Sequence, residues 1–291
     1  LSPYMTIKNS WFFYALVTTI FWGVWGAIIE IPEKNGFPAT MGYIAWAITM
    51  IPCAFVALRL IRWKLDTSLS AIVLGSIVGL AGAGGQLLLF QALREGPAYI
   101  IFPIVSLYPV LTIVLSMAIL KENATTKQYI GIVTALIAIF LLSYSDGETT
   151  SMVGYAWLLL STCVFVLWGL QAFVMKFSNE RMKAESIFFY MMTTAVALSP
   201  VAFAMTDPAT AINYGFSGGG MALLIHFLNS IGALTLVYAL RYGKAIIVVP
   251  MTGLSPVITI ILSLLIYAVW PQTTLLVGIA FAVVAIYLIS E

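Results

Sequence analysis

Continuous apolar stretches of about 20 residues constrain this sequence most, because that length carries an α-helix across the hydrocarbon core of a membrane. Ten such stretches can be placed along the chain, and short connections separate them. They cover residues 11–31, 41–62, 69–92, 96–120, 127–145, 153–175, 184–206, 219–241, 244–268 and 271–290. The pattern predicts an all-α integral membrane protein with ten transmembrane helices.

The composition agrees with a lipid environment. Hydrophobic residues make up 62% of the 291 residues and charged residues only 8%, against about 25% charged residues in an average soluble domain. The net charge of +2 is small and dispersed, so no nucleic-acid partner is expected. The two cysteines, Cys53 and Cys163, lie inside apolar stretches with no spacing that suggests a metal site. No cofactor is expected.

The positions of lysine and arginine predict how the chain crosses the membrane, because cytoplasmic connections carry an excess of both. With a cytoplasmic N-terminus, all but Lys34 and Arg94 of the 13 basic residues fall on the cytoplasmic side. These are Lys8, Arg59, Arg62, Lys64, Lys121, Lys127, Lys176, Arg181, Lys183, Arg241 and Lys244. Both termini are therefore predicted to be cytoplasmic, in a multi-pass protein of the plasma membrane, or of the inner membrane in a bacterium.

The chain also contains an internal repeat. Residues 91–120 align with residues 238–267 at an offset of 147, and half of the aligned positions are identical. The identities include Arg94/Arg241, Gly96/Gly243, Pro103/Pro250, Pro109/Pro256, Thr112/Thr259 and Ser116/Ser263. Trp22-Gly23 aligns with Trp168-Gly169 at an offset of 146. Shared apolar composition does not align these landmarks, so the two halves are interpreted as copies.

Five helices per copy is an odd number, so the second copy is predicted to enter the membrane from the opposite side. The predicted organisation is a cytoplasmic segment at 1–10, a first five-helix repeat at 11–145, an external linker at 146–152 and a second, inverted repeat at 153–291. Met5 is the expected natural start, so residues 1–4 are left out of the predicted fold. Inverted repeats are typical of secondary transporters, with the substrate site near the midplane between the repeats.

These landmarks resemble a known family. The Trp-Gly pair in the first helix of each half, and the pattern Ala-Leu-x-x-Gly-x-Ala followed by two prolines and a glutamate, look like the EamA branch of the drug/metabolite transporter superfamily. The first copy ends its pattern with Leu120-Lys121-Glu122, whereas the second has Ile266-Tyr267-Ala268 and lacks the acidic residue. The resemblance implies a ten-helix transporter. It leaves the substrate open, because the family handles amino acids, other metabolites and toxic cations.

Polar and aromatic side chains at membrane depth are the candidate substrate ligands, because polar groups in lipid are costly. Aromatic faces also bind organic cations and stack on planar rings. The predicted substrate-binding residues are Trp22, Trp25, Gln86, Ser106, Tyr108, Trp168, Gln171, His226, Asn229 and Thr252. His226 shares a helix face with Asn229 and Ser230. That face is interpreted either as a substrate or proton site or as a structural hydrogen-bond knot.

Four prolines and four charged or titratable residues are candidates for conformational roles. Pro103, Pro109, Pro250 and Pro256 are predicted to kink helices that line the cavity and flex, or else to form static kinks. Glu30, Arg94, Arg241 and His226 are candidates for gating or coupling. For Glu30 and the two arginines the alternative is that the charged groups only reach the membrane boundary.

The predicted function is secondary active or facilitative transport, as an exporter or exchanger. No lysine or arginine lies at mid-membrane depth to bind a phosphate, and no Walker A sequence occurs. The expected substrate is a small neutral, zwitterionic or cationic organic metabolite such as an amino acid, moved by alternating access. The alternative is a lipid-handling flippase or membrane scaffold. An enzyme is not expected, and the expected partners are the substrate and membrane lipids, with a monomeric chain.

Overall fold

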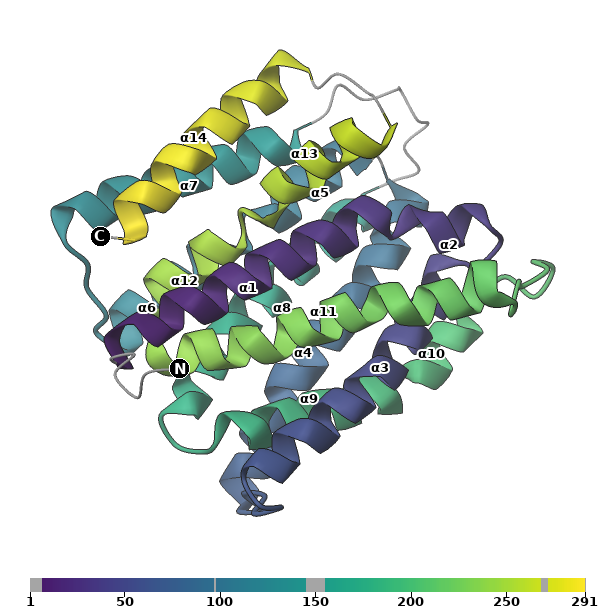
Figure 1. Ribbon diagram of the computed structural model, residues 1–291, viewed down its shortest axis with the longest axis horizontal. Helices are drawn as coiled ribbons and strands as arrows, with labels where there is room; N and C mark the ends of the chain where they lie inside the picture. The colour runs from purple at the N-terminus through teal and green to yellow at the C-terminus, as the bar shows by residue number, and fades with distance from the viewer. Residues whose placement is uncertain (1–6, 97, 145–154, 268–271, 291) are drawn as a thin grey trace.

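The computed structural model describes residues 7–96, 98–144, 155–267 and 272–290, and every regular element in them is a helix (Figure 1). The first half of the chain forms α1 (Ile7–Ile28), α2 (Glu30–Lys34), α3 (Ala39–Leu60), α4 (Leu69–Glu95), α5 (Ala98–Ser106), α6 (Tyr108–Ile119) and α7 (Thr126–Ser143). The second half forms α8 (Ala156–Asn179), α9 (Ala184–Ala197), α10 (Ser199–Ala204), the π-helix η1 (Phe216–Gly220), α11 (Met221–Tyr242), α12 (Ala245–Thr252), α13 (Ser255–Tyr267) and α14 (Thr273–Ser290). Residues 1–6 of the predicted cytoplasmic segment at 1–10 lie outside the described residues. The predicted linker at 146–152 also lies outside them.

The described residues hold nine helical stretches that are long and apolar enough to cross a membrane. A tenth apolar helix, Thr273–Ile289, is shorter than the other nine. Nine of the ten predicted crossings are therefore found by length and composition. The exact count of ten is not confirmed.

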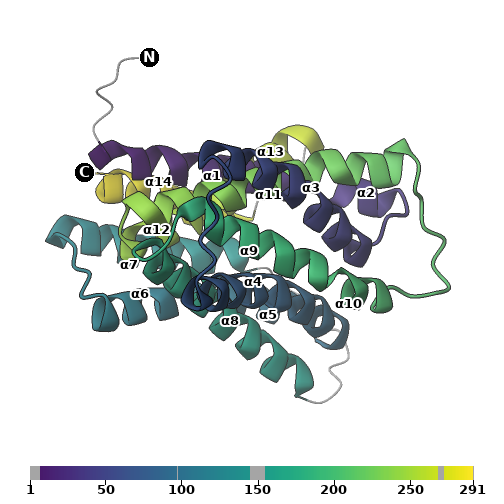
Figure 2. The same ribbon diagram turned by 90° about the horizontal axis from the view of Figure 1, so that it is seen from below.

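The helices form two layers, which are seen edge-on in Figure 2. The first layer contains α1 and α3 from the first half of the chain packed against α11 and α13 from the second half. The second layer contains α4 and α6 from the first half packed against α8 and α9 from the second half. Contacts of α3 with α9, of α6 with α12 and of α7 with α14 join the layers. Each layer thus mixes elements of both halves.

Several crossings are broken into two helices, and a proline follows each break. The breaks lie at Ile29, Leu107, Leu198 and Gly253–Leu254, and the prolines are Pro32, Pro109, Pro200 and Pro256. A proline has no N–H for the carbonyl one turn earlier, and it fits the first turn of a new helix, where that N–H has no partner anyway. Helical structure continues through Pro103 in α5 and Pro250 in α12. The predicted kinks at Pro109 and Pro256 thus coincide with breaks, whereas Pro103 and Pro250 do not end their helices.

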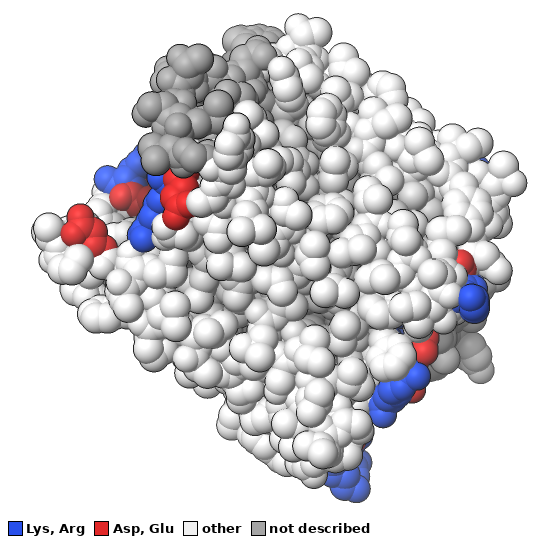
Figure 3. All heavy atoms as spheres, turned by 180° about the vertical axis from the view of Figure 1, so that it is seen from behind, with Lys and Arg blue, Asp and Glu red and all other residues white. Residues whose placement is uncertain are grey.

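Charged side chains gather at the two ends of the layers. Figure 3 shows a broad neutral face with charged groups only at opposite margins. At one end, called here the basic end, Lys183 bonds to Asp66, and Arg241 bonds to the main chain at Asn179 and Met182. At the opposite end, Lys34 forms an ion pair with Glu30, and Asn213 bonds to the carbonyl oxygen of Asn35. This separation is the distribution that a membrane-crossing protein requires, with neutral surface between two aqueous ends.

Candidate functional site

The two tryptophans that the repeat aligns occupy equivalent places. Trp22 of α1 lies on Gly232 of α11, and its Nε1 donates to the carbonyl oxygen of Asn229 at 3.3 Å. Trp168 of α8 lies on Gly85 of α4, and its Nε1 donates to the carbonyl oxygen of Gly82 at 3.3 Å. The offset of 147 that aligns the copies also relates Gly82 to Asn229 and Gly85 to Gly232. Each tryptophan therefore contacts a helix of the other copy at the same relative position.

The aligned threonines repeat this reciprocity. Thr112 of α6 donates to the carbonyl oxygen of Gly169 at 2.9 Å. Thr259 of α13 donates to the carbonyl oxygen of Gly23, also at 2.9 Å. Both glycines follow the aligned tryptophans directly. The first helix of the first copy, α1, thus bonds to α11 through its tryptophan and to α13 through its glycine carbonyl. The first helix of the second copy, α8, bonds to α4 and α6 in the same way.

A polar and aromatic group surrounds Trp168. Gln171 lies against Gly82, and the ring of Tyr108 makes an edge contact with Trp168 at 6.0 Å between centroids. Gln86 lies one turn beyond Gly82 on the same face of α4. Among the described residues, none provides a hydrogen-bond partner to the side chains of Gln86, Tyr108 or Gln171, and their polar atoms are not sealed inside the protein. These groups therefore retain unused donors and acceptors at the centre of the second layer.

His226 lies in the first layer and has a different environment. Its side chain is buried, and its Nδ1 accepts a hydrogen bond of 3.3 Å from Trp25 Nε1. Because Nδ1 is an acceptor, the neutral imidazole carries its proton on Nε2, which is sealed without a partner close to Gly42. Ser230, one turn further along α11, bonds to Thr49 of α3 at 2.8 Å. His226 and Ser230 thus take part in hydrogen bonds between helices, whereas a substrate or proton role for this face of α11 stays a prediction.

The remaining predicted ligands differ in how accessible they are. Thr252 is buried and donates to the carbonyl oxygen of Val249 in its own helix. Ser106 likewise donates to the carbonyl oxygen of Pro103. Asn229 accepts the Trp22 hydrogen bond through its main chain, and its side-chain amide has no partner among the described residues. Of these three residues, Asn229 alone keeps unused donors, whereas the part-buried Ser106 oxygen can still accept a hydrogen bond.

Apart from His226, the predicted gating residues lie at the two ends of the bundle. Glu30 forms an exposed ion pair of 2.6 Å with Lys34 of the same short helix, α2. Arg94 donates to the carbonyl oxygen of Met205 at the end opposite the basic end. Arg241 donates to the carbonyl oxygens of Asn179 and Met182. Both arginines therefore tie a helix end to a neighbouring element, as residues at a membrane boundary can do.

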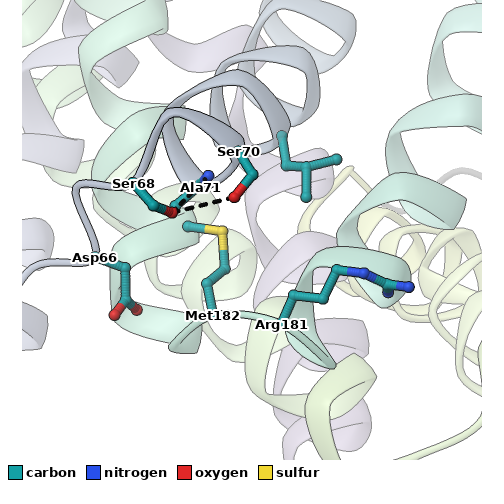
Figure 4. Close-up of a pocket in the computed structure, with 7 residues that line it drawn as sticks. Asp66, Ser68, Ser70, Ala71, Arg181 and Met182 are labelled. Atoms are coloured by element: carbon teal, nitrogen blue, oxygen red, sulfur yellow. Dashed lines mark hydrogen bonds between the residues drawn. The ribbon is translucent and has the colours of Figure 1, made fainter.

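A small cavity of about 70 Å³ lies at the basic end, between the start of α4 and the connection from α8 to α9 (Figure 4). Its lining includes Asp66, Ser68 and Arg181. Ligand pockets usually measure about 300–1,000 Å³, so this cavity suits water rather than a metabolite. Burial tends to raise the pKa of Asp66, but hydrogen bonds from the N–H and ammonium groups of Lys183 prevail and lower it below 3.8. Asp66 is therefore an ionised part of a clasp between two connections.

Some contributors to the interior were not predicted from the sequence. Thr18 of α1 bonds to Thr235 of α11 at 2.8 Å, and Thr19 donates to the carbonyl oxygen of Met251 at 3.4 Å. Nothing in the repeat alignment singles out these two threonines, whereas Thr112 and Thr259 were visible as aligned identities.

Within the described residues, no group of three or more His, Cys, Asp or Glu side chains is placed to hold a metal ion.

Known proteins resemble this chain in both sequence and fold. An uncharacterized protein of Methanocaldococcus jannaschii is 34% identical over 134 residues, which are 45% of this chain and 94% of that protein. A crystal structure described only as that of a protein has the same fold, with a TM-score of 0.76 and 17% identity, covering 94% of this chain and 97% of the other. The model of the EamA-like transporter family matches twice, at residues 9–144 and 154–291. The chain therefore belongs to the EamA-like transporter family.

Proposed function

We propose that this membrane transporter moves a small organic metabolite by alternating access between two inverted five-helix repeats. The reciprocal contacts of Trp22 and Trp168 carry the proposal. A contact that recurs when the two copies exchange roles is expected of a molecule with a pseudo-two-fold axis between its halves. Such a molecule can adopt two related conformations, each with the cavity open to one side. The relative from Methanocaldococcus jannaschii matches 45% of this chain over 94% of its own length, as expected if one copy of the repeat can exist on its own.

The substrate is proposed to be neutral, zwitterionic or cationic, as an amino acid is. Gln86, Tyr108 and Gln171 offer neutral donors and acceptors, and Trp168 offers an aromatic face. The lysines and arginines of the described ion pairs lie in connections or near helix ends. None of these cations is therefore beside Gln86, Tyr108 and Gln171, where it could bind a phosphate. Export or exchange across the plasma membrane, without a dedicated cofactor, is the proposed mode. A coupling role for His226 stays a prediction.

Ligand binding tests the substrate site first. A panel of amino acids and other metabolites is screened for an increase in the thermal stability of the purified protein, because a ligand that binds the native state raises its apparent stability. Gln86→Leu and Gln171→Leu are each expected to weaken the binding of a hit about tenfold, through the loss of hydrogen bonds to the ligand. Gln272→Leu, at the exposed start of α14, is the matched control and leaves binding unchanged.

Counterflow of the same hit in proteoliposomes tests transport. Vesicles loaded with unlabelled ligand are expected to accumulate labelled ligand transiently, and accumulation is expected to fall in the two glutamine variants. Scrambling of labelled lipid without counterflow of any metabolite would favour the flippase alternative. If the ligand affinity is unchanged in both Gln86→Leu and Gln171→Leu, the substrate site does not lie beside Trp168.

A further inference from the structure

Glu122 occupies an unusual position at the basic end. It lies in the connection between α6 and α7, and both carboxylate oxygens accept hydrogen bonds from the first residues of α12. Its Oε1 accepts from the N–H of Ala245 and its Oε2 from the N–H of Ile246, each at 3.1 Å. A carboxylate at a helix N-terminus satisfies unpaired N–H groups and interacts favourably with the helix dipole. Glu122 therefore joins the second layer to the start of α12.

Lys176 completes a second link at the same place. It lies on the last turns of α8, and its Nζ donates to the carbonyl oxygens of Leu240 at 3.1 Å and Gly243 at 2.8 Å. These oxygens belong to the end of α11, in the first layer. The same Nζ lies 4.0 Å from Glu122 Oε1, and the two side chains are only 12% and 8% exposed. A nearly buried charge pair with satisfied partners depends strongly on both members.

The repeat gives the equivalent place at the other end of the molecule, and it is built differently. The offset of 146 places Glu30 opposite Lys176, and the offset of 147 places Leu93 and Gly96 opposite Leu240 and Gly243. An ionised carboxylate cannot donate to a carbonyl oxygen. Glu30 instead pairs with Lys34 in its own helix, and both side chains are more than half exposed. The two offsets place Ala268 or Val269 opposite Glu122 in the sequence, and neither has a carboxylate.

We propose that Glu122 and Lys176 form a one-sided latch that closes the basic end between the two layers and biases the molecule toward the state open at the opposite end. This inference rests on the proposed alternating access. Two halves related by pseudo-symmetry have conformations of similar energy unless their sequences differ. The latch stabilises closure at the basic end, and among the described residues the Glu30 position provides no matching link at the other end. Opening the basic end breaks the bonds of Lys176 to α11 and of Glu122 to α12.

Distances between spin labels test the latch without relying on transport. In a background with Cys53→Ser and Cys163→Ser, one pair of labels is placed at Glu180 and Tyr242, the basic ends of α8 and α11. A second pair is placed at Glu33 in α2 and at Tyr155 directly before α8. Both residues are exposed and lie at the end opposite the basic end. In Lys176→Met, the fraction of molecules with a longer Glu180–Tyr242 distance is expected to rise about tenfold, and the Glu33–Tyr155 distance to shorten. Glu122→Gln is expected to shift both distances in the same direction.

Glu30→Gln is the matched control, since it removes the charge at the equivalent position, and both distance distributions are expected to stay unchanged. Unchanged distances in Lys176→Met and in Glu122→Gln, with native thermal unfolding, would overturn the latch. A shift of equal size in Glu30→Gln would overturn its one-sidedness. Counterflow by the same variants separates the two proposals: flux with unmoved distances refutes the latch alone. Distances that shift in a protein with no flux for any metabolite leave the latch in place and refute the transport proposal.

Discussion

Single small residues decide how closely the two halves of this transporter approach. A methyl group added at Gly85 would lie 2.6 Å from Trp168 Nε1, and one added at Gly232 would lie 2.5 Å from Trp22 Cδ1. Glycine at these positions lets an indole rest directly on the helix backbone, as small residues do where membrane helices pack tightly. The reciprocal contacts between the two copies are thus made by matched glycine–tryptophan pairs.

Replacing these glycines gives a prediction with an internal control. Gly85→Ala and Gly232→Ala are each expected to destabilise the protein by about 1–3 kcal/mol, because the large aromatic ring must be displaced. Gly84→Ala is expected to be neutral or slightly stabilising, since a methyl group there meets no atom within 4 Å. Thermal unfolding in one detergent compares the three variants. Equal melting temperatures for Gly84→Ala and Gly85→Ala would show that the tryptophan contact is not a packing constraint.

At the scale of elements, broken helices sit where the two layers meet. The break before Pro109 separates α5 from α6, and the break before Pro256 separates α12 from α13. α6 packs against α12, so two interrupted crossings meet at the junction of the layers. Broken helices in a membrane are tolerated where protein or a wet cavity surrounds the released carbonyl groups. This placement suits a hinge.

Restoring the missing N–H groups tests the hinge. Pro109→Ala and Pro256→Ala give back a donor for the carbonyl oxygens of Val105 and Thr252, which favours continuous helices. Turnover in counterflow is expected to fall about tenfold, with ligand affinity changed much less, because the conformational step rather than the site is altered. Pro52→Ala, in the unbroken α3, is expected to have a smaller effect on turnover. Equal loss of affinity and turnover would identify the breaks as parts of the site instead.

The clasp at Asp66 predicts a pH dependence. A carboxyl group whose pKa is lower in the folded than in the unfolded protein contributes stability above the unfolded value, and this contribution is lost as the pH falls through the folded value. Asp66→Asn is therefore expected to lower the melting temperature at pH 7, and the difference from the wild type is expected to shrink below about pH 4. Glu180→Gln, which removes an exposed pair with Arg181, serves as the control. A constant difference at every pH would assign the effect to packing.

The sequence predicts elements better than it predicts contacts. Apolar length places nearly every crossing, and the alignment of Trp22 with Trp168 identifies the pair that relates the two copies. The breaks at Ile29 and Leu198 were not predicted, because a proline in an apolar stretch can either interrupt a helix or, like Pro52, remain inside it. Whether His226 faces a substrate or Trp25 depends on the rotation of α11 against α1, and tertiary packing sets that rotation.

At the scale of the whole molecule, each layer takes helices from both repeats, so a change in one copy reaches both layers. α1 packs on α11 while α8 packs on α4, and the joining pairs α3 with α9 and α7 with α14 connect equivalent helices of the two copies. In the proposed alternating access, movement between the layers acts on the joining pairs and leaves the contacts within each layer intact. The Glu122–Lys176 latch crosses that same boundary, so a local charge pair can bias a global change.

The last helix decides the topology of the whole chain. α14 has 18 residues, about 27 Å at 1.5 Å per residue, against a hydrocarbon core of about 30 Å. α7 has the same number of residues and lies beside it, with Lys127 at the start of α7 over the ring of Tyr287 near the end of α14. The two helices are therefore antiparallel, and the C-terminal end of α14 lies at the basic end, where Figure 1 also shows the first turn of α1.

If the basic end is cytoplasmic, a fluorescent protein fused after Glu291 should fluoresce, and alkaline phosphatase fused at the same place should be inactive. The same reporters fused after Thr210, beyond α10 at the opposite end, should give the reverse result and serve as the control. This outcome would establish that α14 completes a tenth crossing, so that both copies have five helices and face opposite ways. An active phosphatase after Glu291 together with an active one after Thr210 would leave nine crossings, and with them no inverted repeat.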